Sequence, residues 1–160
     1  KVENLKNDPG SILIGPNSHI RGELLVWKHG GLISIGSNCF IGSNSRIWSG
    51  SEKGVRVGNN VLISHNVSII DSDSHEIDYI QRAKGFEYLT RFGHPESNIH
   101  VKTAPVIIED SVWINQNVSV LKGVKIGQGS IVGAGSVVTK DIPSFSLAAG
   151  NPCVVIKKLN

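Results

Sequence analysis

The sequence predicts an all-β protein whose short strands wind into the coils of a triangular prism. Three observations support this fold class: aliphatic residues recur every six positions, a small or β-branched residue stands two positions before each, and Gly or Asn occupies the turns. Spacings of two and six match strands, whereas an amphipathic helix repeats at three and four. Six residues then form one face of a coil, and three faces complete the coil.

The repeat can be followed along the chain. A weak first copy begins at Ile14 with "IGPNSHIRG". Regular copies follow at Ile35, Ile41, Ile47, Val57, Ile63, Ile69, Ile108, Ile114, Val120, Ile126, Val132 and Val138. Counting these hexads predicts about five coils with an aliphatic interior. The antiparallel strands of a β-sandwich are the alternative, but we would not expect them to keep a six-residue phase from Ile108 to Val138.

The turns between the strands have the composition that this fold needs. The runs "GSN", "GNN" and "GQG" place Gly and Asn where the chain changes direction. Both residue types tolerate a positive φ angle, which tight turns require.

The rhythm stops after Ser72 and resumes at Val106, which predicts an insertion of 33 residues over 73–105. Connections of this length in a compact domain are usually functional or disordered. This insertion contains four aromatic residues that can pack against other side chains, so we expect it to be ordered. They are Tyr79, Phe86, Tyr88 and Phe92. The whole chain, 1–160, is expected to form one domain that includes this insertion.

A short tail over 143–160 is expected to end the prism. Pro143 lacks the backbone N–H that a further strand pairing would use. We expect the tail to fold back over the last coil and to cover the strand edge there.

Composition narrows the class of protein. The net charge is +3 without a cluster of Lys and Arg, so we expect no nucleic-acid partner. No apolar run approaches the roughly 20 residues of a membrane helix, so no transmembrane segment is expected. Cys39 and Cys153 form neither a metal motif nor a disulfide pattern, so we expect a cytoplasmic protein without a metal.

The C-terminal half carries motifs beyond the repeat. Residues 106–157 contain "VWI", "IVGAGSVVTKDIP" and "AAGNP". In these runs the chain resembles the left-handed β-helix, hexapeptide-repeat acyltransferases, in particular the branch of the maltose, galactoside and surface-polysaccharide O-acetyltransferases. The resemblance implies a left-handed parallel β-helix, acetyl-CoA as the donor, and a homotrimer with active sites between subunits.

The insertion begins with a histidine among acidic residues. "NVSIIDSDSHEID" resembles the segment in which these enzymes carry their catalytic histidine, with Glu76 where they usually have Pro. Acetyl transfer to a hydroxyl needs a base, and neutral imidazole is the usual one near pH 7. We therefore predict His75 as the general base. Asp73 is the first candidate for orienting it or binding the acceptor, and Asp78 is the second.

The remaining histidines are weaker candidates. His65 lies at a turn position of the preceding coil and is a second candidate for lining the acceptor site. His94 and His100 share the insertion, but no motif assigns either of them a role.

The resemblance also implies a donor site along the C-terminal coils. Trp113, Gln116 and Ala134 would lie beside the pantetheine arm of CoA, and the small residue Gly133 would let the ligand approach the backbone. Thr139 and Lys140 would lie near the far end of the arm. Lys157 would meet the nucleotide phosphates, which need cationic or N–H partners. Trp113 would form either a wall of this groove or a contact between subunits.

The sequence thus favours an acetyl-CoA-dependent O-acetyltransferase acting on a carbohydrate hydroxyl, as in the biosynthesis of a surface polysaccharide or lipopolysaccharide. An amino-sugar N-acetyltransferase is a close alternative, because the same base can serve an amine. A zinc-dependent β-helix enzyme that hydrates carbon dioxide belongs to another class, and the histidine spacing of that group is missing here. A non-catalytic trimeric scaffold ranks last.

Overall fold

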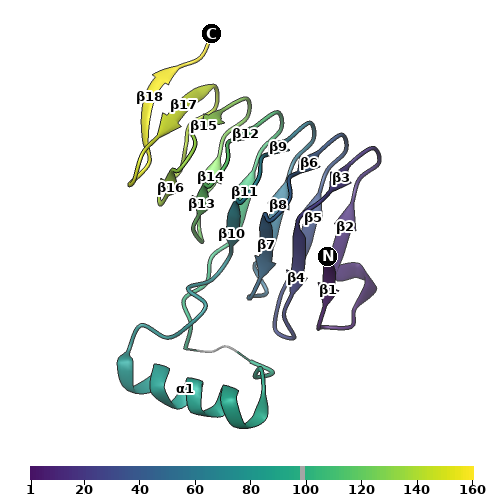
Figure 1. Cartoon of the computed structure of the whole chain (residues 1–160), viewed down its shortest axis with the longest axis vertical. Coiled ribbons are helices and arrows are strands. Elements are labelled where there is room, and N and C mark those ends of the chain that lie inside the picture. Colours follow the sequence, from purple (N-terminus) through teal and green to yellow (C-terminus); the bar gives the residue numbers. More distant parts are fainter. Residues whose placement is uncertain (98–99) are drawn as a thin grey trace.

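The computed structural model describes residues 1–97 and 100–160. The chain winds as a left-handed parallel β-helix with the shape of a three-sided prism, and its coils follow one another in sequence order (Figure 1). Within the coils, strands pair in parallel with their counterparts in the neighbouring coils, and the three faces form three sheets, which we call A, B and C. The fold class predicted from the hexads is confirmed.

The three sheets share the strands in turn. Sheet A contains β1 (Val2–Asn4), β4 (Glu23–Val26), β7 (Arg46–Ser49), β10 (Ser68–Ile70), β13 (Ser119–Val120) and β16 (Val137–Val138). Sheet B contains β2 (Ile12–Ile14), β5 (Ile33–Ile35), β8 (Val55–Val57), β11 (Val106–Ile108) and β14 (Lys125–Ile126). Sheet C contains β3 (His19–Ile20), β6 (Phe40–Ile41), β9 (Leu62–Ile63), β12 (Trp113–Ile114), β15 (Ile131–Val132), β17 (Ser146–Ala149) and β18 (Val154–Lys158). Five coils, β2–β4 to β14–β16, are complete.

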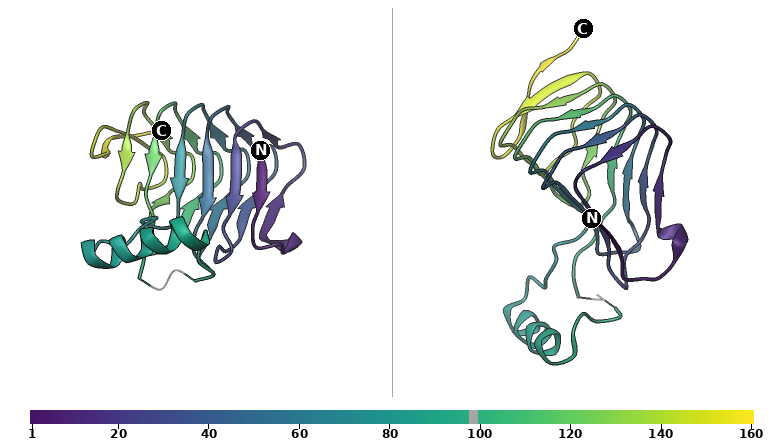
Figure 2. Two further views of the ribbon diagram at one scale, coloured as in Figure 1. Left: turned by 60° about the horizontal axis from the view of Figure 1, so that its bottom comes forward. Right: turned by 45° about the vertical axis from the view of Figure 1, so that its right-hand side comes forward.

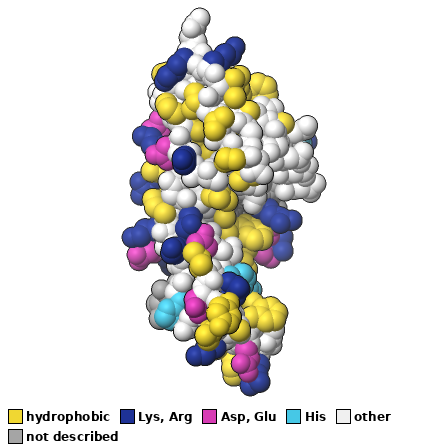
Figure 3. Space-filling model, turned by 90° about the vertical axis from the view of Figure 1, so that its left-hand side faces the viewer, with side chains coloured by type: hydrophobic (Ala, Val, Ile, Leu, Met, Phe, Trp, Pro, Cys, Tyr) yellow, Lys and Arg dark blue, Asp and Glu magenta, His cyan; other side chains and the backbone are white. Residues whose placement is uncertain are grey.

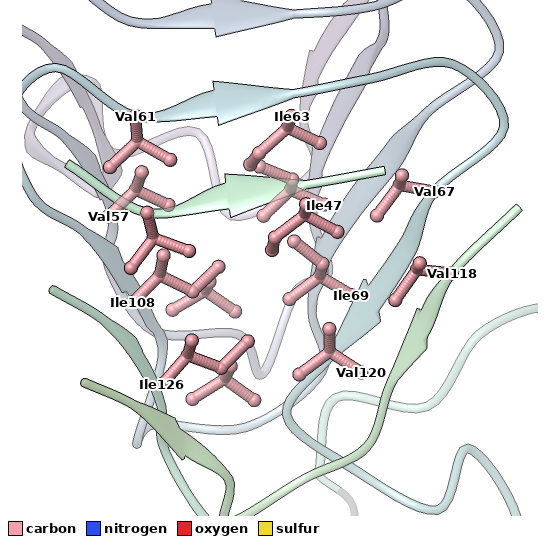
Figure 4. Close-up of a cluster of buried hydrophobic side chains, with 14 of the residues drawn as sticks. Ile47, Val57, Val61, Ile63, Val67, Ile69, Ile108, Val118, Val120 and Ile126 are labelled. Carbon is pink, nitrogen blue, oxygen red and sulfur yellow. The ribbon is translucent and has the colours of Figure 1, made fainter. Parts of the chain in front are cut away.

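The register explains the six-residue period. In sheet A, Ile47 pairs with Ile69, which pairs with Val120, and in sheet C, Ile63 pairs with Ile114. These side chains point inward and are buried, so that each aliphatic residue stacks on its counterpart in the next coil (Figure 4). Burying one such side chain contributes about 1.5–3 kcal/mol. The interior is therefore a continuous aliphatic column.

The first predicted copy of the repeat differs from the others. Ile14 pairs with Ile35, yet its side chain is 44% exposed, because β2 is the last strand of sheet B and no coil covers it. A short 3-10 helix, η1 (Pro9–Ser11), precedes β2, and the Asp8 side chain accepts a hydrogen bond from the Gly10 N–H.

Asparagine and glycine occupy the tight corners, as the sequence predicted. Asn66 and Asn117 have φ angles of 57° and 58°, and Gly135 has a φ of 70° at the equivalent position of a later coil.

At the C-terminal end of the chain, β17 pairs with β15, and β18 pairs with β17 in the antiparallel sense. The tail thus extends sheet C and covers its edge.

The segment 73–105, predicted as a loop insertion, contains a helix that the sequence analysis did not predict. The helix α1 runs from Tyr79 to Phe92 and extends away from the prism, below one of its corners (Figures 1 and 2). Asp78 caps its first turn and Gly93 follows its last turn with a φ of 81°. The apolar period of α1 is weak and none of its residues is buried, so its caps were the only sequence signals for it. Residues 98–99 of the predicted insertion lie outside the described residues.

Candidate functional site

The corner between sheets A and B, which we call corner AB, carries the long connections of the prism. Residues 27–32, 50–54 and 71–105 all connect a strand of sheet A to a strand of sheet B there. Later coils turn the same corner with short segments such as 121–124. Side chains from three successive coils therefore meet at one end of this corner.

A buried carboxylate fixes the base of the insertion. Asp71 is fully buried, and its two oxygens accept hydrogen bonds from the N–H groups of Gly50 and Gly54 at 2.7 and 3.0 Å and from the hydroxyls of Ser49 and Ser51 at 3.1 and 3.0 Å. Burial raises the pKa of Asp71, and these four donors oppose the rise. The carboxylate thus holds the 50–54 connection against the point where the insertion begins.

The two carboxylates predicted beside His75 have other partners. An Asp73 carboxylate oxygen lies 2.6 Å from Nζ of Lys122 in the next coil, and Asp73 meets His75 only through a backbone hydrogen bond of 2.7 Å. The Asp78 side chain accepts from the Gln81 N–H at 2.8 Å as the cap of α1. Within the described residues, neither carboxylate is hydrogen-bonded to the His75 ring.

The far end of the insertion returns to the first complete coil through three adjacent contacts, which we call the clasp. The ring of His94 packs on Trp27 with centroids 4.1 Å apart. His29 Nδ1 donates to the carbonyl of Pro95 at 3.2 Å, and Lys28 pairs with Glu96 at 2.6 Å. Because a carbonyl only accepts, neutral His29 carries its proton on Nδ1 and presents Nε2 as an acceptor.

Between the corner and the clasp lies a cavity of about 200 Å³. Its lining combines two tryptophans, three histidines and a carboxylate: Trp27, Trp48, His29, His75, His94 and Glu76. The helix contributes Gly85 and Leu89, one turn apart on the same face of α1. In Figure 3, histidine and hydrophobic side chains lie together at the end of the molecule that carries the insertion.

One histidine of the cavity, His94, is shifted toward its neutral form. The pKa of His94 is lowered by partial burial and by the neighbouring cationic groups His29, His75 and Lys28. A neutral imidazole can accept a proton from a hydroxyl held beside it. The cavity therefore offers a proton acceptor, apolar faces and hydrogen-bonding groups in one place. No three His, Cys, Asp or Glu side chains in 1–97 and 100–160 are grouped closely enough to hold a metal ion.

His65, the second candidate, lies elsewhere. It occupies the corner between sheets C and A, and its Nδ1 accepts from the Ser43 N–H at 3.0 Å. Neutral His65 therefore carries its proton on Nε2, which makes that nitrogen a donor and not a base. His65 and His100 are both absent from the lining of the cavity.

The predicted donor residues lie on other parts of the prism. Trp113 stands on sheet C, 41% exposed, and its Nε1 donates to Ser64 Oγ at 3.4 Å. Gln116 and Ala134 follow His65 at the same corner in later coils, where the Asn117 N–H donates to the His65 carbonyl at 3.1 Å and the Gly135 N–H to that of Gln116 at 3.0 Å.

The other predicted donor residues are more dispersed. Gly133 packs against β17, where an added Cβ would meet Cβ of Ala149 at 2.8 Å. Lys157 lies on β18, opposite Leu147. Thr139 and Lys140 follow β16 and lie at corner AB, two coils beyond the insertion. A single chain thus does not bring His75 together with Trp113 or Lys157.

Sequence reasoning missed most of the cavity. Trp27, His29 and Trp48 follow or end strands of the early coils, and no motif marks them. The one available signal was the extra length of the 27–32 connection, which breaks the hexad spacing.

Comparison with known proteins finds hexapeptide repeats in this chain. The family model described as bacterial transferase hexapeptide (six repeats) matches residues 105–140, and that described as hexapeptide repeat of succinyl-transferase matches residues 32–70. The chain thus carries hexapeptide repeats of the transferase type in two separate stretches. Both matched segments are stretches of regular coil, and the insertion lies between them.

Two relatives illustrate the range of this family. A polysialic acid O-acetyltransferase of Escherichia coli O1:K1 / APEC is 37% identical over 92% of this chain and 43% of its own length. A galactoside O-acetyltransferase of Lactococcus lactis is 35% identical over 79% of this chain and 63% of its own length. The chain spans about half the length of the curated relatives it matches.

Solved structures of the hexapeptide-repeat family share the fold. A hexapeptide-repeat acetyltransferase of Vibrio cholerae, solved in complex with acetyl coenzyme A, has a TM-score of 0.74 and 28% identity, with 97% of this chain and 74% of that chain covered. A maltose O-acetyltransferase of Clostridium difficile has a TM-score of 0.54 and 29% identity, with 100% of this chain and 67% of that chain covered.

Proposed function

We propose that this protein transfers an acetyl group from acetyl-CoA to a hydroxyl group of a carbohydrate, with His75 as the general base. The observation that carries the proposal is the position of His75 in a cavity of aromatic and histidine side chains at the corner of a hexapeptide-repeat prism. The named functions of the two relatives, which are O-acetyltransferases of carbohydrates, support the choice of acceptor.

The reaction follows from the chemistry of the imidazole. His75 takes the proton of the acceptor hydroxyl while the oxygen attacks the thioester carbonyl. A carbon–oxygen bond forms, the carbon–sulfur bond breaks, and the imidazolium returns the proton to the leaving CoA thiolate. No proton is gained or lost by the enzyme over one cycle.

The donor groups belong to a neighbouring subunit in this proposal. His75 and Lys157 lie on different parts of one chain, so a site that uses both needs two copies. A homotrimer of parallel prisms would place sheet C and the tail of one copy beside corner AB of the next. Trp113, Gln116, Ala134, Thr139 and Lys140 would then line the groove for the CoA arm.

Thiol release from acetyl-CoA, measured with a panel of sugars and nucleotide sugars, tests the activity. We expect acceptor-dependent release that falls by about a hundredfold or more in His75→Ala. Activity that persists in this variant would refute the role of His75. If the product carries the acetyl group on nitrogen, the acceptor is an amine and not a hydroxyl.

Mixed subunits test the shared site. His75→Ala protein, which lacks the base, and Lys157→Ala protein, which should bind acetyl-CoA weakly, are unfolded together, refolded and assayed at an acetyl-CoA concentration well below the wild-type KM, with each protein refolded alone as the control. If sites form between copies, about a quarter of the sites in random trimers regain both intact residues. Mixed protein whose activity equals the mean of its two parents would place the whole site within one chain.

A further inference from the structure

Glu76 brings the only carboxylate that lines the cavity within the described residues. Its two carboxylate oxygens have no hydrogen-bond or ion-pair partner in 1–97 or 100–160. The other acidic groups nearby are occupied, since Glu96 pairs with Lys28, Asp73 with Lys122, and Asp78 caps α1. Glu76 therefore presents lone pairs that a bound molecule can satisfy.

The position of this carboxylate is fixed by its surroundings. Nη1 of Arg82 donates to the backbone carbonyls of Glu76 and Ile77 at 2.9 and 3.0 Å, which ties Glu76 to the first turns of α1. Arg82 does not line the cavity. A Cβ at Gly85 would lie 2.9 Å from Oε1 of Glu76, so the glycine makes room for the carboxylate. Glycine is unfavourable inside a helix relative to alanine, and this close approach explains why it stands here.

The opposite wall of the cavity is aromatic. The rings of Trp27 and Trp48 meet edge to face, with centroids 6.2 Å apart and planes at 87°. Nε1 of Trp48 is buried, and it has no hydrogen-bond partner among the described residues. Ser72 and Ser74 add hydroxyl groups. Apolar faces with a few polar groups are typical of small-molecule sites, and the C–H face of a pyranose matches an aromatic face.

We propose that Glu76 selects the acceptor. In this assignment, which rests on the proposed function, a pyranose without a carboxylate stacks on Trp27, and neighbouring hydroxyls of the sugar donate hydrogen bonds to Glu76. Sugar acids, such as uronic and sialic acids, are disfavoured because they bring a second carboxylate beside an acceptor-only group. Like charges brought together in a site repel each other, and this repulsion sets the specificity.

Matched sugars separate charge from shape. The probes are the methyl glycosides of glucose and galactose and the corresponding methyl uronides, which differ only in the group at C6. Binding to the full-length chain is read from tryptophan fluorescence in a Trp113→Phe background, so that Trp27 and Trp48 report the cavity. No acetyl-CoA is added, so the result is independent of the thiol-release assay for the proposed function.

We expect at least one neutral glycoside to bind about tenfold or more tightly than its uronide at pH 7.5. Glu76→Gln keeps the shape and removes the charge, so the ratio should shrink to about threefold or less. The control is Glu87→Gln, which removes a carboxylate of α1 that pairs with Arg91 outside the cavity and should leave the ratio unchanged. Circular dichroism confirms that each variant is folded.

Three outcomes would overturn the proposal. They are a uronide that binds as tightly as its neutral partner, a ratio that does not change in Glu76→Gln, and no saturable fluorescence change with any neutral glycoside. If neutral glycosides bind selectively while thiol release is absent, the site stands and the proposed reaction fails.

Discussion

The Asp73 carboxylate forms a 2.6 Å ion pair with Lys122, and this contact joins the first residues of the insertion to the corner of the following coil. Both side chains are about 27–28% exposed, so the pair is neither fully solvated nor buried. Asp73 thereby links the insertion to the next coil at corner AB. To orient the His75 ring, the Asp73 carboxylate would have to break its ion pair with Lys122.

We predict that Asp73→Asn and Lys122→Met have similar, modest effects. Each should lower the free energy of unfolding by up to about 1 kcal/mol, because partly exposed pairs contribute little. The double variant should cost less than the sum of the two, which urea unfolding measures as a coupling energy. Loss of acetyl transfer by more than a hundredfold in Asp73→Asn alone, with Lys122→Met active, would instead give Asp73 a direct role beside His75.

Asp71 should be far more important for stability than Asp73. Replacing it with Ala leaves three buried donors without an acceptor, since the Ser49 hydroxyl can still donate to the Ser51 carbonyl at 3.2 Å, and each unsatisfied group costs about 1–3 kcal/mol. We expect Asp71→Ala to lower the free energy of unfolding by at least 3 kcal/mol. Asp71→Asn keeps one acceptor oxygen and should cost less. Equal stability of wild type and Asp71→Ala in urea would contradict this account of the corner.

The clasp should weaken in acid through His94. The folded state lowers the pKa of His94 through partial burial and the nearby His29, His75 and Lys28, so protonation favours the unfolded state. This contribution to stability is present above the unfolded pKa of about 6.5 and is lost as the pH falls through the folded pKa.

His94→Phe retains an aromatic ring for packing on Trp27 but cannot titrate. We expect the difference in unfolding free energy between pH 8 and pH 5 to be smaller in this variant than in the wild type. His100→Phe, which alters an exposed histidine outside the cavity, is the control and should titrate like the wild type. A larger pH dependence in His94→Phe would reverse the sign that we assign to His94.

Lys157 and Lys158 form a matched pair for the donor site. They are neighbours on β18, opposite Leu147 and Ser146, and Nζ of Lys158 donates to the Ser144 carbonyl at 3.2 Å. If Lys157 binds the CoA phosphates, Lys157→Ala should raise KM for acetyl-CoA about tenfold and leave kcat unchanged, because the contact is the same in the ground and transition states. Lys158→Ala should change neither constant. Equal effects of the two variants would assign the result to the tail and not to phosphate binding.

The hexads predicted the prism because each of its contacts repeats. Ile63 and Ile114 pair in adjacent coils, and the same spacing recurs in every regular coil, so the pattern is visible in the sequence. The tight corners were also predictable, because Asn66 and Asn117 hold positive φ angles that few residue types adopt.

The cavity was not predictable in the same way. His75 was identified by motif, but its neighbours Trp27 and Trp48 come from two earlier coils and approach it only through the winding of the chain. The caps Asp78 and Gly93 mark α1 locally, yet its apolar period is too weak to distinguish a helix from a loop. Residues that each occur once, at the ends of strands, leave no period to detect.

The insertion leaves and re-enters the prism through adjacent backbone. The Ala104 N–H donates to the Asp71 carbonyl at 3.0 Å, and Ser72 forms a bridge with Thr103. The strands on either side keep their register, since β10 still pairs with β13 and β11 with β8. A segment of another length that starts and ends at these residues would therefore leave the phase of the coils unchanged. The part of the proposed acceptor site that the insertion contributes can consequently change, in evolution or by design, while the register of the scaffold stays the same.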